Sequence, residues 1–338
     1  MKTPLTLHSV PRRLAFLGFL LALLALLAGV MLLSLRLGAL KLSFAQIFDL
    51  LLNRPEGIRY QIVCNIRLPR ILAGALVGAG LAVSGTVLQG VMRNPLAAPG
   101  IIGVSSGGGL AGILVMLAFP QYGILLVPAA FLGALLTALL VYLLAWKQGV
   151  SPVRLILAGI AVAAMLGAVS SAVLLFNAEK AGGVLDFSIG SLTARSWKHL
   201  RFSGIYLLAG IAGSFVYSGK LNILALGDEV ARGLGLRVER CRFIFIALAA
   251  LTAASAVSIA GLLGFVGLIA PHIVRMVIGS DNRFLLPGSA LFGAALVTAC
   301  DTVGRIVIEP SELPAGIIMA LLGPPFFLWL LRRQRYEA

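Results

Sequence analysis

The stretch RLPRILAGALVGAGLAVSGTVLQGVMRNPLAAPGIIGVSSGGGLAG, residues Arg67–Gly112, decides the fold. It is apolar enough to lie in a bilayer, yet it is crowded with glycine, proline and small polar residues. Small residues let helix backbones approach closely, and irregular backbone at membrane depth is tolerated only inside protein or beside a watery cavity. The stretch therefore predicts two tightly packed membrane helices, joined by a Pro/Gly-rich turn, next to a transport pathway.

The composition of the whole chain also requires a lipid environment. The chain has 338 residues, of which 60% are hydrophobic and only 12% are charged, whereas a soluble domain carries about 25% charged residues. A membrane helix needs roughly 20 apolar residues, so a chain of this length predicts about ten spans. Because the apolar runs are continuous rather than alternating, a β-barrel is disfavoured. We expect an all-α polytopic bundle and a single transmembrane domain over residues 1–338.

Four motifs in the deciding stretch follow one another in a recognisable order. They are RLPR (67–70), G-x-x-x-G (74–78), AVSG-x-x-x-Q (82–89) and RNPLAAPGIIGVSSG (93–107). With them the chain resembles the FecCD-type, BtuC-like permeases over nearly its whole length. These permeases are the membrane subunits of binding-protein-dependent ABC importers for iron chelates, haem and cobalamin. The resemblance implies their permease fold and an import function for this chain.

The distribution of basic residues predicts the orientation in the membrane. The net charge of +15 comes from short Lys/Arg clusters between apolar runs, which is typical of topology signals and not of a nucleic-acid-binding surface. The run Leu14–Leu35 is longer than a signal-peptide core and lacks a small-residue cleavage site, so we expect an uncleaved first helix. If the chain enters the first helix from the cytoplasm, the loops that then fall on the cytoplasmic side carry more Lys and Arg than the external loops. We expect a multi-pass inner (cytoplasmic) membrane protein with both termini in the cytoplasm.

The remaining spans follow from the apolar runs and their turns. We expect membrane helices over 14–35, 68–88, 100–118, 123–146, 155–177, 202–217, 243–260, 264–279, 289–307 and 315–331. The external segment 178–201 is expected to hold a short helix near the mouth of the pathway, because family members carry one there. Its motif begins with Phe187 where the family usually has Trp. LSFAQIFDLLLN (42–53) has helical apolar spacing and is expected to lie along the external surface.

The most charged internal stretch is GKLNILALGDEVARGLGLRVERCR (219–242). Within it, LALGDEVARGLGL (224–236) predicts two short cytoplasmic helices, because Asp228 and Glu229 lie early in the first and Gly233 and Gly235 break the run. An amphipathic loop helix at the lipid headgroups explains this pattern equally well. The resemblance, however, implies the coupling loop that seats in a groove of the ATP-binding subunit. The residues that match the family pattern are Leu226, Gly227, Asp228, Glu229, Ala231, Leu234 and Gly235.

Three arginines lie at external helix ends, namely Arg67, Arg70 and Arg305. Interfacial snorkelling is the ordinary explanation for any one of them. The resemblance implies that they face acidic residues of the binding protein, where ion pairs steer docking and fix its register. Asp301 is expected to pair with Arg305 one helical turn away. We favour this structural role for Asp301 over a proton relay.

Several classes of chemistry find no support in the sequence. No G-x-x-x-x-G-K-[ST] motif is present, so the chain is not a P-loop ATPase. The three cysteines are isolated and the three histidines are far apart, and His272 in PHIVR is better explained by packing than by haem or iron binding. We therefore expect no enzymatic activity and no cofactor in this chain, with ATP and Mg bound by a partner ATPase.

The pathway is expected to be lined by small-residue helix faces. Candidate lining residues are Ser84, Ser105, Ser106, Ser170 and Ser171. The resemblance implies a homodimer with two ATP-binding subunits, one periplasmic substrate-binding protein and surrounding membrane lipid. A ferric siderophore is the expected substrate, with haem next and then cobalamin or molybdate. An ion-coupled secondary transporter would need paired intramembrane carboxylates, and only Asp301 is a candidate. A membrane enzyme or assembly scaffold would need a cluster of catalytic polar residues, which the sequence does not show.

Overall fold

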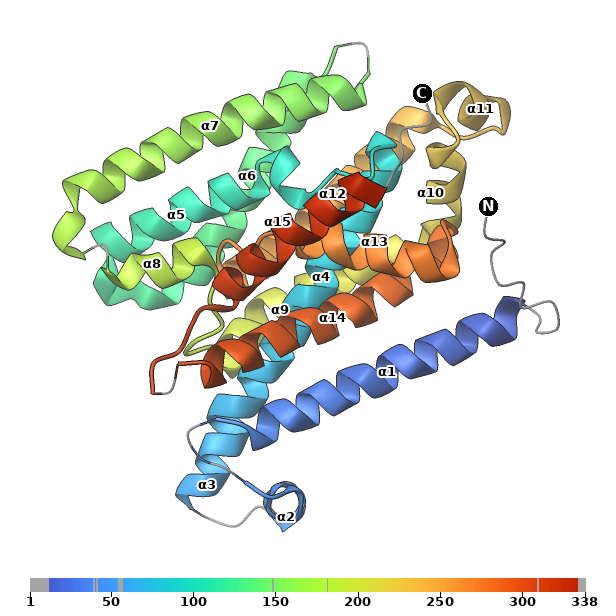
Figure 1. Ribbon diagram of the computed structural model, residues 1–338. Helices are drawn as coiled ribbons and strands as arrows, with labels where there is room; N and C mark the ends of the chain where they lie inside the picture. Colours follow the sequence, from blue (N-terminus) through green and yellow to red (C-terminus); the bar gives the residue numbers. More distant parts are fainter. Residues whose placement is uncertain are drawn as a thin grey trace.

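The computed structural model describes residues 12–38, 40, 42–53, 57–147, 149–180, 182–308 and 310–333. Within these residues all regular structure is helical (Figure 1), and the only β-type pairing is one isolated bridge between Trp146 and Val150. Seven helices are long and apolar enough to cross a membrane, and three shorter apolar helices accompany them. The predicted all-α bundle of about ten apolar helices is confirmed.

The helices fall into long spans, shorter apolar helices and small connecting elements. The long helices are α1 (Arg12–Arg36), α4 (Leu68–Met92), α6 (Leu126–Ala145), α7 (Pro152–Phe176), α9 (Trp197–Val216), α12 (Val238–Ala260) and α14 (Asn282–Ile306). The shorter apolar helices are α5 (Val104–Ala118), α13 (Val266–Ile278) and α15 (Ala315–Arg333). The connecting elements include α2 (Phe44–Asn53), α3 (Ile58–Gln61), α8 (Gly182–Ile189), α10 (Ser218–Ala225) and α11 (Asp228–Gly233).

The bundle has two distinct ends. Helices α10 and α11 lie at one end, together with the first turn of α1 and the last turn of α15 (Figure 1). Helices α2, α3 and α8 lie at the opposite end (Figure 1). We call these the α11 end and the α8 end. The short helix expected in 178–201 and the amphipathic helix expected in 42–53 are therefore at the same end.

Helix α4 is the centre of the bundle, and glycines permit its contacts. It packs against α9, α12, α13 and α14. In the continuous helical span Ile58–Met92, which ends with α4, 78% of the most apolar 18-residue stretch is buried. A Cβ atom on Gly78 would lie 2.1 Å from the carbonyl oxygen of Gly293, and one on Gly85 would lie 2.0 Å from that of Gly267. Only glycine fits such backbone contacts. The prediction of tight packing in the deciding stretch is thus explained residue by residue.

The glycine contact between α4 and α13 gives a first testable prediction. Replacing Gly85 with alanine should lower the unfolding free energy by about 1–3 kcal/mol, because the added methyl group meets backbone that cannot rotate away. The melting temperature of the detergent-solubilised chain measures this loss. Gly29→Ala in α1 is the matched control, since nothing lies within 4 Å of a Cβ atom there. Equal melting temperatures for the two variants would contradict the assignment.

Two helices lie at the periphery of the bundle. In α1 and α7 only 6% and 11% of the most apolar 18-residue stretch is buried. Both are strongly apolar, so their exposed faces are suited to lipid or to another membrane subunit. They contrast with α12 and α14, whose most apolar stretches are 72% and 67% buried.

Some predicted boundaries are wrong. The predicted helix 289–307 begins too late, because α14 begins at Asn282 and continues through Pro287. The Asp281 side chain accepts a hydrogen bond from the Arg283 amide at 3.0 Å, and the Asn222 side chain accepts one from the Asn282 amide at 2.8 Å. These two acceptors satisfy the first amides of the helix, and so it starts before the proline.

Candidate functional sites

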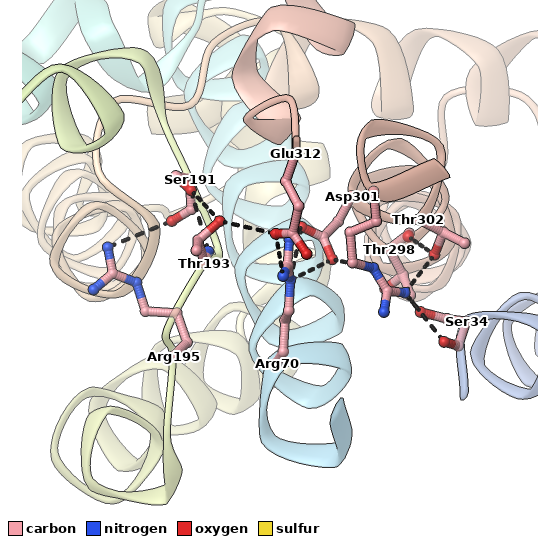
Figure 2. Close-up of polar contacts among 10 residues, drawn as sticks. Ser34, Arg70, Ser191, Thr193, Arg195, Thr298, Asp301, Thr302 and Glu312 are labelled. Atoms are coloured by element: carbon pink, nitrogen blue, oxygen red, sulfur yellow. Dashed lines mark hydrogen bonds and ion pairs between the residues drawn. The ribbon is translucent and has the colours of Figure 1, made fainter. Parts of the chain in front are cut away.

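The α8 end holds a buried cluster of charged side chains (Figure 2). The Arg70 guanidinium on α4 donates to both carboxylate oxygens of Asp301 on α14, with its Nε 2.9 Å from Oδ2 and its Nη2 2.9 Å from Oδ1. The two side chains are only 8% and 3% exposed. Arg70 Nη1 also lies 2.7 Å from Oε2 of Glu312, whose side chain is 38% exposed. Arg70 therefore connects a buried carboxylate to a surface carboxylate.

The other two arginines of this cluster hold the end of α1. Arg305 Nε lies 3.6 Å from Oδ2 of Asp301, which confirms the pairing expected from their spacing. Arg305 Nη2 donates to the Ser34 carbonyl oxygen at 3.1 Å. Arg67 donates to the carbonyl oxygens of Leu35 and Leu40, both at 2.6 Å. The Ser34 and Leu35 carbonyls belong to the last turn of α1, where carbonyls lack an intrahelical partner, and the guanidinium groups supply one. Leu40 lies in the segment that follows α1.

The arginines predicted to contact a binding protein are thus turned inward in this structure. Arg67, Arg70 and Arg305 are 6%, 7% and 6% exposed, and each has partners within the chain. Their role in docking stays a prediction. The exposed side of the Arg70 guanidinium is already paired with Glu312.

The cluster continues into the loop between α8 and α9 (Figure 2). Thr193 Oγ1 donates to Glu312 Oε2 at 3.4 Å and accepts from Ser191 Oγ at 3.0 Å. The Arg195 guanidinium donates to the Ser191 carbonyl oxygen at 3.4 Å. Burial lowers the pKa of Arg195 to about 10; the nearby Arg70 acts in the same direction and Asp186 opposes it. The hydrogen bonds therefore link α4, α14 and the loop after α8.

The predicted coupling loop (219–242) contains most of α10, all of α11 and the start of α12. The two short helices predicted within 224–236 are wrong, because that segment holds only α11 and the last two residues of α10. One arginine fixes the loop to α12. Arg242 is 2% exposed, and its Nη2 donates to both carboxylate oxygens of Asp228 at 2.7 and 2.8 Å. Its Nη1 donates to the Val150 carbonyl oxygen at 2.7 Å and to Glu239 at 3.1 Å. Asp228 is the first residue of α11, so this pair ties the short helix to a long span and to the turn before α7.

Apolar side chains of the same loop point outward. Leu226, Val230 and Leu234 are 63%, 50% and 61% exposed. Glu229 is also exposed, whereas Ala231 is fully buried. Gly227 and Gly235 have φ values of +112° and +79°, a backbone region that favours glycine. The loop is therefore a rigid, glycine-bounded surface with three exposed apolar side chains.

The candidate pathway serines are not equivalent. Ser84 is fully buried, and its hydroxyl donates to the Ala249 carbonyl oxygen on α12 at 2.8 Å, so it belongs to a helix contact. Ser105, Ser106 and Ser170 are half-buried and Ser171 is exposed. Ser170 and Ser171 lie on α7, the most exposed of the internal spans. Lining of a pathway stays a prediction for all of them.

Sequence reasoning missed two members of these sites. Glu312 follows α14 in a short turn, and nothing in its local pattern indicates that it meets Arg70. Arg242 carried a usable signal, because an arginine at the start of an apolar helix needs a partner when it is buried. His272 packs edge-on against Phe326 with ring centroids 6.0 Å apart. The described residues contain no group of three or more His, Cys, Asp or Glu side chains that could hold a metal ion.

Comparison with known proteins gives consistent relatives. The profile of the FecCD transport family matches residues 24–333. The hemin transport system permease protein HmuU of Yersinia pestis is 40% identical over 95% of this chain and 96% of its own length. The Fe(3+)-citrate import system permease protein YfmE of Bacillus subtilis is 39% identical over 88% and 90%. A solved structure described as an inward-facing conformation of an ABC transporter assigned to the metal-chelate type aligns with a TM-score of 0.85, at 35% identity, over 94% of this chain and 99% of that chain.

Proposed function

Because the chain belongs to the FecCD transport family, we propose that it is the membrane-spanning subunit of an ATP-driven importer that carries an iron chelate. A ferric siderophore or a related ferric chelate is the favoured substrate. Haem is the second candidate, because a hemin transport permease is 40% identical to this chain. Cobalamin and molybdate come after these two.

One observation supports the proposal most directly: the coupling loop at the α11 end presents an exposed apolar surface, made by Leu226, Val230 and Leu234, that is held in place by an ion pair. Leu226, Val230 and Leu234 expose apolar side chains to water, which is unusual for a loop that lies outside the apolar helices. The salt bridge between Asp228 and Arg242 holds this surface on α12. We propose that an ATP-binding subunit docks here and that its movement passes to α12 as a rigid body. ATP and Mg would be bound by that partner, and this chain would hold no cofactor and perform no bond chemistry.

The same assignment sets the orientation. The α11 end faces the cytoplasm with both termini, and the α8 end faces outward, in the inner (cytoplasmic) membrane. The excess of Lys and Arg in the loops of the α11 end supports this orientation. N-terminal residues 1–11 and Arg335 lie outside the described residues.

We further propose that two copies of the chain form the pathway between them. The most apolar stretch of α7 is 11% buried within one chain, and the small and polar residues of this helix include Ser170 and Ser171. A second copy would cover part of this helix and leave the rest facing a wide, weakly binding passage. Two ATP-binding subunits would then dock on the paired α11 surfaces.

A binding protein is proposed to dock at the α8 end, over Arg70. Glu312 occupies the outer side of this guanidinium at 2.7 Å, so a carboxylate of the binding protein would compete with Glu312 for it. Replacing Glu312 with glutamine should therefore raise the affinity of the binding protein by roughly 2- to 10-fold, through one charge-assisted contact made available. Surface plasmon resonance on the reconstituted chain measures the change.

The control for this docking experiment is Glu179→Gln, an exposed carboxylate in the segment before α8. It removes the same charge without touching Arg70. A general electrostatic effect would change both variants alike, and an unchanged or lower affinity for Glu312→Gln would count against docking over Arg70. Arg70→Glu is a poorer variant, because the cluster would then hold three carboxylates, those of Asp301, Glu312 and the new glutamate.

The proposed function is tested by reconstitution. The chain, its partner ATPase and the binding protein are placed in vesicles, and uptake of ferric siderophores, haem, cobalamin and molybdate is measured with and without ATP. ATP-dependent uptake of one ferric chelate supports the proposal, and uptake of haem alone would promote the second candidate. Accumulation by the chain alone, driven by a proton or sodium gradient, would instead identify a secondary transporter.

A further inference from the structure

A lipid-sized groove runs along the outside of the bundle between α6 and α12. Two adjoining hollows, of about 480 and 320 Å³, share Tyr142 and Phe243 in their walls. The inner hollow reaches back to Leu135, and the outer one ends at Trp146. The span between these two residues of α6 is roughly 16 Å at 1.5 Å per residue. Half of a hydrocarbon core about 30 Å thick is close to this length, so the groove covers one leaflet.

The walls of the groove are apolar and open to the side. Leu139, Leu143 and Phe243 expose 48%, 60% and 49% of their surface. Trp146 is 51% exposed at the α11 end of the groove, where aromatic side chains are favoured at the membrane interface. The groove is therefore shaped for an extended hydrocarbon chain.

One polar group in the wall of the groove has no partner. Tyr142 is 6% exposed, and its hydroxyl is buried without a hydrogen bond to any part of the chain that the structure describes. It lines both hollows. A buried hydroxyl is ordinarily hydrogen-bonded, and a small rotation of the Tyr142 ring toward the groove would let a phosphate or ester oxygen of a lipid accept a hydrogen bond from it.

The charges at the open end of the groove favour an anionic headgroup. Arg240 lines this end, Lys147 follows Trp146, and both side chains are exposed. Among the described residues neither forms an ion pair. Glu239 also lines the groove, but its carboxylate is occupied by Arg242 at 3.1 Å and by the Val150 amide at 3.2 Å. The end of the groove therefore has one free cation in its wall, a second next to Trp146 in the chain, and one neutralised carboxylate.

We propose that the groove between α6 and α12 binds an anionic phospholipid of the cytoplasmic leaflet, with its acyl chain along Leu135–Trp146. The phosphate would lie between Arg240, Lys147 and the Tyr142 hydroxyl. The leaflet assignment rests on the orientation proposed above; the site itself does not depend on the transported substrate. Basic pockets between membrane helices on the cytoplasmic side are suited to such headgroups.

The experiment measures lipid retention by the full-length chain in mild detergent. Native mass spectrometry follows phosphatidylglycerol and phosphatidylethanolamine added at equal concentration. The wild-type chain should retain phosphatidylglycerol preferentially. Lys147→Gln and Arg240→Gln should each weaken this retention about fivefold, and Tyr142→Phe about fivefold as well. Arg283→Gln, an exposed arginine on α14 at the same end, is the matched control and should change nothing.

Four outcomes would overturn the proposal. Equal retention of the two lipids, or retention unchanged in the three groove variants, would show that the site does not select an anionic lipid. A Tyr142→Phe chain with a higher melting temperature than wild type, independent of phosphatidylglycerol, would show that the hydroxyl meets no ligand. Oxidative cross-linking of Leu139→Cys between two copies, beyond that of the wild-type chain with its own three cysteines, would assign the groove to a second copy. None of these readouts involves transport, so they leave the proposed import function separately testable.

Discussion

Replacing Asp301 with alanine should lower the unfolding free energy of the chain by about 3–5 kcal/mol. Asp301 is 3% exposed and contacts two guanidinium groups, those of Arg70 and Arg305. Without it Arg70 keeps only Glu312, and Arg305 keeps only hydroxyl and carbonyl acceptors on α1 and α14. A buried cation that loses its counter-charge is strongly destabilising, whereas the intact pair itself adds little. The expected result is a large fall in the melting temperature of the detergent-solubilised chain.

Two comparisons isolate the cause of this loss. Asp49→Ala removes an exposed carboxylate from α2 at the same end of the bundle and should leave the melting temperature nearly unchanged. Combining Asp301→Ala with Arg305→Met should cost less than the sum of the two single changes, because the second removes a cation that the first left unpaired. Full additivity, or a melting temperature equal to that of Asp49→Ala, would show that Asp301 does not neutralise the cluster.

The same residue also separates two classes of transporter. Asp301→Asn keeps the shape and one acceptor of the side chain, so part of the stability should remain. If ATP drives transport, the folded Asp301→Asn complex should still accumulate substrate. A proton-coupled transporter would instead lose accumulation in this variant, because its only intramembrane carboxylate candidate could no longer titrate.

The limits of sequence reasoning are visible in this cluster. The pairing of Asp301 with Arg305 follows from helical spacing and was predicted. The stronger contact of Asp301 is with Arg70, which is 231 positions away in the chain. Local periodicity carries no signal for such a contact, since it depends on how α4 and α14 cross. The glycines at 78 and 293 permit that crossing, but their partners could not be identified from the pattern.

The start of α14 was predicted wrongly for a related reason. Proline and polar residues in 280–288 are typical of a turn, yet α14 begins at Asn282. Of the two side chains that accept hydrogen bonds from its first amides, Asp281 is local, but Asn222 belongs to α10, so the start of one helix depends partly on a side chain of another. The hydrophobic runs, by contrast, are properties of contiguous sequence. That is why the number of apolar helices was predicted correctly.

Exchanging Leu226, Val230 and Leu234 together for glutamine should weaken association with the ATP-binding subunit roughly 100-fold or more. Each exposed apolar side chain buried at an interface contributes about 1–3 kcal/mol, and about 1.4 kcal/mol corresponds to tenfold in affinity. The chain should fold normally, because the three side chains are 63%, 50% and 61% exposed before docking. Co-purification and titration with the partner ATPase measure the loss, and the melting temperature of the chain alone serves as the folding check.

The control for this triple change is Val153→Gln in the first turn of α7. Val153 is 65% exposed and lies outside the coupling loop. Its exchange should leave association within a few-fold of wild type. If the triple variant binds the ATPase as tightly as the control, the α11 surface is not the docking site.

Docking and transmission of movement should separate at Asp228. Its carboxylate fixes α11 to Arg242 and so to α12, whereas Glu229 is exposed and forms no ion pair among the described residues. Asp228→Ala should therefore reduce ATP-driven uptake at least roughly tenfold while the ATPase stays bound, because a movement of α11 no longer reaches the long span. Glu229→Ala should change association only slightly and mainly at low salt. Equal transport by the two variants would mean that the Asp228–Arg242 pair stabilises the loop without transmitting force. If the pair does transmit force, its loss must lower substrate uptake more than it lowers binding of the ATPase.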